Sequence, residues 1–146
     1  MTKSRITHRQ RRIVRERARG QCEYCRSQMI FSTHDFSIDH IVPIQKGGGS
    51  TLDNLALACQ GCNNFKFTKT EAPDPISEIQ VPLFHPRRAN WHDHFVWNHD
   101  FTRILGRTPT GRVTIEVLRL NRENLVSFRS VLYAAGKHPP PELEEG

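Results

Sequence analysis

A chain of 146 residues with 36% hydrophobic residues has room for one small folded domain and an appended segment. No stretch approaches the roughly 18 apolar residues of a membrane span, and no apolar signal segment follows the basic N-terminus, so we expect a soluble, cytoplasmic protein. The formal net charge of +6 is concentrated in residues 1–20, which carry eight basic residues and one acidic residue. This distribution predicts contact with a polyanion such as nucleic acid.

Residues 1–20 are predicted to form a basic N-terminal helix. Thr7 is a suitable N-cap, and Gly20 is a suitable stop after Ala18. A narrow stripe at helical spacing is expected to face the core, formed by Ile6, Gln10, Ile13, Val14 and Ala18. The arginines on the opposite side favour contact with phosphates, although a merely solvated helix face is the alternative.

Four cysteines occur as two Cys-x-x-Cys pairs, Cys22/Cys25 and Cys59/Cys62. Disulfides, a redox motif or a metal site could use them, but a cytosolic location disfavours disulfides and a redox motif needs one pair alone. Two pairs with no cysteine left over are typical of a tetrahedral structural zinc site. Structural zinc contributes on the order of 10–16 kcal/mol, so we expect the metal to decide whether this module folds.

The segment between the cysteine pairs is predicted to be a β-hairpin. Residues 36–42 form a short apolar strand that Pro43 ends, and an exposed, flexible loop containing three glycines follows. Residues 55–58 form the second strand, and a short helix runs from about Gln60 to Lys69. The order is therefore strand, long loop, strand, helix.

The rest of the chain is divided by composition. Residues 71–82 are rich in proline and acidic residues and are predicted to be a linker, so the core module covers residues 21–70. Residues 83–136 are predicted to be a small α/β C-terminal extension, and residues 137–146 a disordered tail.

Within the extension, aromatic residues suggest a strand over residues 91–97 that pairs with residues 101–105. Residues 110–120 fit either strand alternation or a capped helix, and we favour the helix. Asn121 is expected to cap a final amphipathic helix that ends at Gly136.

Several motifs occur in a fixed order over residues 21–69: Cys-x-x-Cys, Asp-His-Ile-Val-Pro, a Gly-Gly loop, Leu-Asp-Asn-Leu and Cys-x-x-Cys-Asn-x-x-Lys. Together they resemble the HNH endonuclease family. The resemblance implies an α+β fold of the ββα-metal (His-Me finger) type, in which a hairpin and a helix hold a divalent ion beside the scissile phosphate. A softer resemblance of the C-terminal extension to the tails of some HNH nucleases implies no chemistry.

The resemblance implies a role for each matching residue. Asp39 would be a metal ligand, His40 the general base, and Asn54 the residue that holds the loop and the imidazole. Asn63 stands where the family has its final His or Asn and would be the second protein ligand, with Asn64 as the alternative. Because an amide oxygen is a hard ligand, this H-N-N variant favours Mg²⁺ or Mn²⁺ as the catalytic ion, beside structural Zn²⁺.

Elementary chemistry supports these roles. An imidazole has an ordinary pKa near 6.5, so at neutral pH it is largely unprotonated and can accept a proton from water. A cation relieves charge on the phosphate and the leaving oxygen. Neighbouring side chains on a strand point to opposite faces, so Asp39 and His40 can share a site only where the strand twists or ends, and Pro43 marks such an end.

Nucleic-acid contacts are predicted at basic residues in and around the module: Lys66, Arg5, Arg9, Arg12 and Lys46. For Lys66, which matches the family's lysine after the second cysteine pair, an ordinary solvated lysine is the alternative. His92, His94 and His99 could form a second metal site, but nothing completes it. The remaining histidines are predicted to be surface residues: His8, His34, His85 and His138.

The sequence thus predicts a metal-dependent endonuclease acting on DNA, most simply double-stranded, in restriction, phage or mobile-element biology. Cutting both strands with one active site needs a homodimer or two encounters. The alternative is a non-catalytic zinc module that binds nucleic acid, and a zinc-held protein-interaction domain is a third reading that explains neither the charge nor the Asp-His pair.

Overall fold

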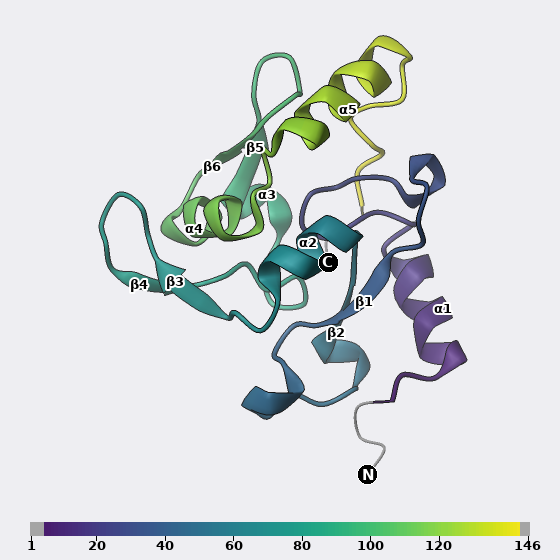
Figure 1. Ribbon diagram of the computed structural model, residues 1–146, viewed down its shortest axis with the longest axis vertical. Helices are drawn as coiled ribbons and strands as arrows, with labels where there is room; N and C mark the ends of the chain where they lie inside the picture. Colours follow the sequence, from purple (N-terminus) through teal and green to yellow (C-terminus); the bar gives the residue numbers. More distant parts are fainter. Residues whose placement is uncertain (1–4, 144–146) are drawn as a thin grey trace.

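The structure is a computed structural model that describes residues 5–143, so the outer ends of the predicted N-terminal segment and tail lie outside the described residues. It is a mixed α+β fold built on small two-stranded sheets (Figure 1). The α-helices are α1 His8–Arg17, α2 Gln60–Lys66, α3 Trp91–His94, α4 Pro109–Leu118 and α5 Glu123–Ala134. The strands are β1 Ser37–His40, β2 Leu55–Ala58, β3 Glu71–Pro73, β4 Gln80–Pro82, β5 Phe95–Trp97 and β6 Ile104–Gly106. Short 3₁₀ turns cover Met29–Phe31, Ile44–Lys46 and Leu52–Asn54.

Helix α1 forms as predicted, with a capping box at its start. The Thr7 hydroxyl accepts from the Gln10 backbone N–H, and the Gln10 side chain accepts from the Thr7 N–H. Val14 and Ala18 are buried against the hairpin, and Gly20 lies in the left-handed region with φ +70°. None of the described helices has the length and apolarity needed to cross a membrane.

Strands β1 and β2 pair antiparallel, with His40 opposite Leu55 and Asp39 opposite Ala56. All four residues of β2 are buried. Since alternate residues of a strand face opposite sides, this burial requires cover on both faces of the hairpin. Helix α1 lies against β2, and α2 lies against β1 (Figure 1). Helix α2 ends at Lys66, three residues earlier than predicted, and Phe67 follows with a positive φ of 52°.

The predicted linker is instead a second hairpin, β3–β4. Its turn is held to α4, because the buried Asp74 carboxylate accepts from Arg112 Nε and Nη2, each at 2.9 Å. Ser77 also donates to Asp74 Oδ2 from its hydroxyl and its backbone N–H. The local contact with Ser77 and the long-range contact with Arg112 order a segment that its composition alone marks as flexible.

The extension differs from its prediction in two details. The predicted strand over 91–97 begins as the short helix α3 before β5, which pairs antiparallel with β6. The helix favoured for residues 110–120 is present as α4, which ends at Leu118 with Arg119 as its C-cap. The N-cap of α5 is Arg122 instead of Asn121. The Asn121 side chain serves β6 instead: it accepts from the Ile104 backbone N–H at 2.7 Å and donates to the Ile104 carbonyl at 2.8 Å.

The predicted disordered tail is ordered up to residue 143. The His138 ring packs edge-on against Trp97 with ring centroids 4.7 Å apart, and its Nε2 lies 2.8 Å from the Phe101 carbonyl oxygen. Gln21 and Gln28 donate to tail carbonyls at Pro141 and Lys137. The prediction that His138 is a surface residue is therefore wrong, because the extension supplies an aromatic wall that covers its ring.

One hydrophobic cluster joins the hairpin module and the extension. It includes Val14 and Leu57 from the first half and Trp91, Phe95 and Leu118 from the second. The Trp91 indole N–H donates to the Tyr24 carbonyl at 2.9 Å, within the first cysteine turn. The extension therefore packs directly on the segment that carries the cysteines.

Candidate functional site: a four-cysteine centre beside a strand end

The four cysteines converge, as predicted. Their Sγ atoms lie within 4.8 Å of one another, and all four are buried. In each pair the second cysteine's backbone N–H donates to the first cysteine's Sγ at 3.4 Å, which directs both thiols inward. Cys59 is also the N-cap of α2, so the second pair turns directly into the helix. Four converging sulfur donors fit one tetrahedral Zn²⁺.

Asp39 and His40 lie at the end of β1 and point to opposite faces of the strand. The Asp39 carboxylate points inward: its Oδ2 accepts from the Tyr24 hydroxyl at 2.7 Å and lies 3.2 Å from Lys66 Nζ. Burial raises the pKa of Asp39, while the Lys66 ammonium and the Tyr24 hydroxyl act in the opposite direction. The carboxylate is therefore already engaged by a buried ammonium group.

Lys66 is buried, although its predicted role is a phosphate contact at the surface. Its side chain is 1% exposed, and Nζ donates to the Ile41 carbonyl at 2.9 Å as well as to Asp39. In this arrangement Lys66 is not placed to contact a phosphate. It joins α2 to the end of β1, where the strand's carbonyl oxygens need a donor.

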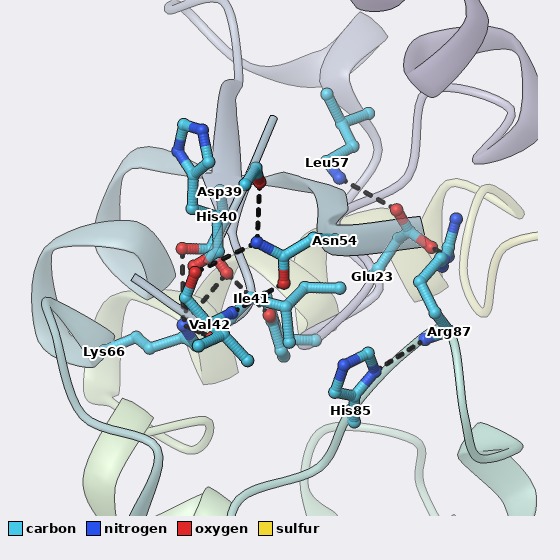
Figure 2. A network of polar contacts seen from close by, with 12 residues as sticks. Glu23, Asp39, His40, Ile41, Val42, Asn54, Leu57, Lys66, His85 and Arg87 are labelled. Carbon is cyan, nitrogen blue, oxygen red and sulfur yellow. Dashed lines mark hydrogen bonds and ion pairs between the residues drawn. The ribbon is translucent and has the colours of Figure 1, made fainter. Parts of the chain in front are cut away.

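The His40 ring lies on the other side of the strand from Lys66 (Figure 2). His40 is half-buried, and its Nε2 lies 2.9 Å from the Ser50 hydroxyl. Burial lowers the pKa of His40; the Asp39 charge raises it, and the Lys66 charge lowers it further. The imidazole is therefore neutral at pH 7, which is the state that accepts a proton.

Asn54 closes the loop that carries Ser50. Its side-chain oxygen accepts from the Val42 N–H at 2.9 Å, and its Nδ2 donates to the carbonyls of Val42 at 3.0 Å and Gly49 at 2.8 Å (Figure 2). A Cβ on Gly48 would overlap the Val42 carbonyl oxygen, so this approach needs glycine. The loop predicted to be flexible is exposed but pinned at both ends.

Gln10 links the N-terminal helix to the same loop. Its Nε2 donates to the Ser50 carbonyl at 2.6 Å while its Oε1 completes the capping box. Sequence reasoning missed this contact, although Gln10 was the one polar residue in an otherwise apolar stripe. The helix therefore helps to position the serine that contacts His40.

The predicted metal-binding amides lie on α2. Asn63 is half-buried and Asn64 is exposed, and Asn63 lies three residues before Lys66, on the same face of the helix. As they stand, Asp39 and Asn63 do not fit a divalent ion, because the Lys66 ammonium and the Tyr24 hydroxyl already occupy the Asp39 carboxylate.

The predicted nucleic-acid contacts other than Lys66 are exposed: Arg5, Arg9, Arg12 and Lys46. The structure adds a basic cavity of about 390 Å³ that sequence reasoning missed, lined by Arg17, Arg26, Arg87 and Arg88 among others. The carboxylate in its lining belongs to Glu23, which is paired with Arg87 and accepts from the Leu57 N–H. The adjacent Arg87 and Arg88 are the sequence signal that could have pointed to this basic cavity.

Two of the histidines considered for a second metal site have other partners. His92 Nε2 lies 2.6 Å from Glu142 Oε2, and His94 Nδ1 lies 2.6 Å from the Thr108 hydroxyl. Within residues 5–143, the side chains that cluster closely enough to hold a metal ion are the four cysteines. The predicted histidines therefore do not complete a second metal site.

One comparison with known protein families covers the hairpin, the helix α2 and the four-cysteine cluster together. Residues 22–68 match the family model described as HNH endonuclease, which confirms the predicted resemblance over this segment. No curated protein and no solved structure matched the chain.

Proposed function

We propose that this protein is an HNH endonuclease that hydrolyses phosphodiester bonds in DNA, with His40 as the general base. The HNH segment indicates a nuclease-type function. The observation that carries the proposal is the environment of His40: a half-buried imidazole of lowered pKa, beside Ser50 on a loop that Asn54 pins. Such a base is unprotonated at neutral pH and can accept a proton from a water molecule that attacks phosphorus.

The proposal requires one tautomer of His40, because the Ser50 hydroxyl can either donate or accept a hydrogen bond. When Nε2 carries the hydrogen and donates it to the Ser50 hydroxyl oxygen, the lone pair is left on Nδ1. Ser50 then orients the ring, while the Gln10 side chain and Asn54 hold the Ser50 segment. Ser50, Gln10 and Asn54 are thus positioning residues, and His40 is the residue that handles the proton.

The identity of the catalytic ion and its ligands belongs to the same proposal. Mg²⁺ or Mn²⁺ at Asp39 and Asn63 requires that the Lys66 ammonium first leaves the carboxylate. Without that exchange, Asp39 is a structural partner of Lys66 and Tyr24. Because the residues as they stand do not fit the ion, the activity assay must vary the metal explicitly.

The decisive assay is plasmid cleavage. Supercoiled plasmid is incubated with the wild type, with His40→Ala and with His34→Ala as a matched control, since His34 is exposed and lies outside the loop contacts. Each protein is tested with Mg²⁺, with Mn²⁺ and with a chelator. We expect nicked or linear DNA from the wild type and the control, and none from His40→Ala. Equal, metal-independent preservation of the plasmid by all three proteins would sink the proposal.

One observation favours the second candidate, a non-catalytic zinc module that binds nucleic acid. The buried Lys66 ammonium is already paired with the Asp39 carboxylate, which is the predicted anionic ligand of the ion. If the plasmid stays intact but a labelled duplex is bound in a salt-dependent way, this second function replaces the first.

A further inference from the structure

Arg122 reaches the four-cysteine centre from outside the segment that matches the HNH family. It lies between α4 and α5, and its Nη2 donates to Cys59 Sγ at 3.4 Å. The same guanidinium approaches Cys62 Sγ from Nη1 at 3.7 Å and from Nη2 at 3.9 Å. Both contacted cysteines belong to the second pair, at the start of α2.

The guanidinium is held in this position from behind. Nη1 also donates to the carbonyls of Leu118 at 3.2 Å and Arg119 at 3.1 Å, at the C-terminal end of α4. The last carbonyls of a helix lack partners within the helix and attract a cation, so these contacts are favourable in themselves. The Phe65 ring lies beside the guanidinium, with its centroid 5.6 Å from Cζ.

Gly61 provides the room for this approach. A Cβ added at residue 61 would lie 2.5, 2.8 and 3.1 Å from Nη2, Cζ and Nε of Arg122. Real carbon atoms do not approach so closely, so any other residue would push the guanidinium away from the sulfurs. Glycine is a poor helix former, and here it occupies the first turn of α2 between Cys59 and Cys62.

The charge of the Arg122 guanidinium is favourable beside the cysteine sulfurs of a zinc site. Four thiolates around one Zn²⁺ carry a net charge of about −2, which is costly in a buried setting without compensation. A guanidinium that donates to two of the sulfurs offsets part of this charge and so stabilises the zinc-bound centre. Removing a group that hydrogen-bonds to the metal ligands, and not to the metal itself, typically changes metal affinity by about 10–100-fold.

We propose that Arg122 is a positioning residue of the zinc centre that slows metal loss and ties the C-terminal extension to the two cysteine pairs. The proposal does not depend on nuclease activity. It means that the zinc site of this protein is completed by a residue more than fifty positions beyond the HNH segment.

The first test is the rate of zinc release to a coloured chelator from the zinc-loaded full chain. We expect Arg122→Gln to release zinc about 10–100-fold faster than the wild type, with Arg122→Lys in between. Arg119→Gln is the matched control: its guanidinium lies over the same Phe65 ring, at 4.8 Å, but its contacts within residues 5–143 do not include a cysteine. Equal rates for Arg122→Gln and Arg119→Gln overturn the proposal.

The second test is a double-mutant cycle that does not depend on how well Arg122→Gln folds. Gly61→Ala displaces the guanidinium without removing its charge, so we expect faster zinc release and faster thiol labelling. In an Arg122→Ala background the added methyl group meets no guanidinium, so Gly61→Ala should not accelerate release further. The same acceleration in both backgrounds, or none in either, overturns the proposal.

Discussion

Lys66 Nζ lies 3.2 Å from Asp39 Oδ2, and these two side chains are 1% and 5% exposed. Removing one member of a buried ion pair typically costs about 3–5 kcal/mol, because the other charge stays buried without a partner. We therefore expect Lys66→Met to lower the free energy of unfolding by about that amount in a urea titration. The exposed Lys69→Met is the control.

The double variant Asp39→Asn with Lys66→Met should lose less stability than the sum of the two single variants, since no unpaired charge remains. Strict additivity would contradict the ion pair. If the divalent ion binds at Asp39 by replacing Lys66, Mg²⁺ should raise the melting temperature of Lys66→Met more than that of the wild type. An equal shift in both proteins argues against Asp39 as a ligand.

The glycines of the loop differ in what they tolerate. A Cβ at Gly48 would overlap the Val42 carbonyl and approach Asn54 Nδ2 at 2.8 Å, whereas a Cβ at Gly49 meets nothing within 4 Å. We expect Gly48→Ala to destabilise the protein by about 1–3 kcal/mol and to reduce cleavage, and Gly49→Ala to be near neutral. Unfolding curves and plasmid nicking rates provide the two readouts. Similar effects at both positions would disprove the pinned loop.

The pH dependence of cleavage reports on His40. Because burial lowers the pKa of His40, the base stays unprotonated at pH values somewhat below its ordinary value of about 6.5. We expect the acid limb of the kcat/KM profile to lie below pH 6.5 in the wild type. In Ser50→Ala the ring loses its hydroxyl partner, so both kcat and the position of the limb should change. A limb at or above pH 6.5 in the wild type would contradict the assignment.

The stability of the fold should fall in mild acid. Burial also lowers the pKa of His138, whose ring contacts Trp97 and the Phe101 carbonyl. A depressed folded pKa means that the unfolded chain binds the proton first, so stability is present above pH 6.5 and is lost as the pH falls towards the folded value. His138→Gln should flatten this loss between pH 7.5 and 5.5 in thermal unfolding, whereas His8→Gln, at an exposed site, should leave it unchanged.

Binding to duplex DNA should depend on salt through the exposed arginines of α1 and its approach. Each phosphate contact contributes about 0.9 to the slope of log K against log salt. Replacing Arg5, Arg9 and Arg12 with glutamine in the His40→Ala background should reduce the slope by about 2–3. Arg103→Gln, also exposed, is the single-site control. An unchanged slope would remove these residues from the interface, and Arg88→Gln then tests the arginine-lined cavity.

Local sequence signals were enough to predict part of this fold. The N-cap Thr7, the paired cysteines and the apolar run of β2 are signals that act over a few residues. Helix α1, the hairpin and the start of α2 therefore follow from the sequence pattern alone. What the pattern did not contain were partners distant in the chain. Asp74 is held in place by Arg112, and the buried Lys66 is paired with Asp39.

The contrast between local signals and distant partners also explains how much of the candidate site could be predicted. The cysteine cluster could be predicted because all four ligands carry their own spacing signal. The opposite orientation of Asp39 and His40 is that of a regular strand. The expectation that the strand end at Pro43 lets both side chains share a site is therefore not met. The identity of the group that faces Asp39 carried no sequence signal. Arg122 carries no local signal, since an arginine before a helix is common.

The contact between Gln10 and Ser50 has a practical consequence for anyone who trims this protein. A fragment cut at the limits of the family match, residues 22–68, would lose the α1 residues that cover β2 and the amide that holds the Ser50 carbonyl. Such a fragment should bind zinc poorly and expose apolar strand surface, so expression trials ought to start from the whole chain.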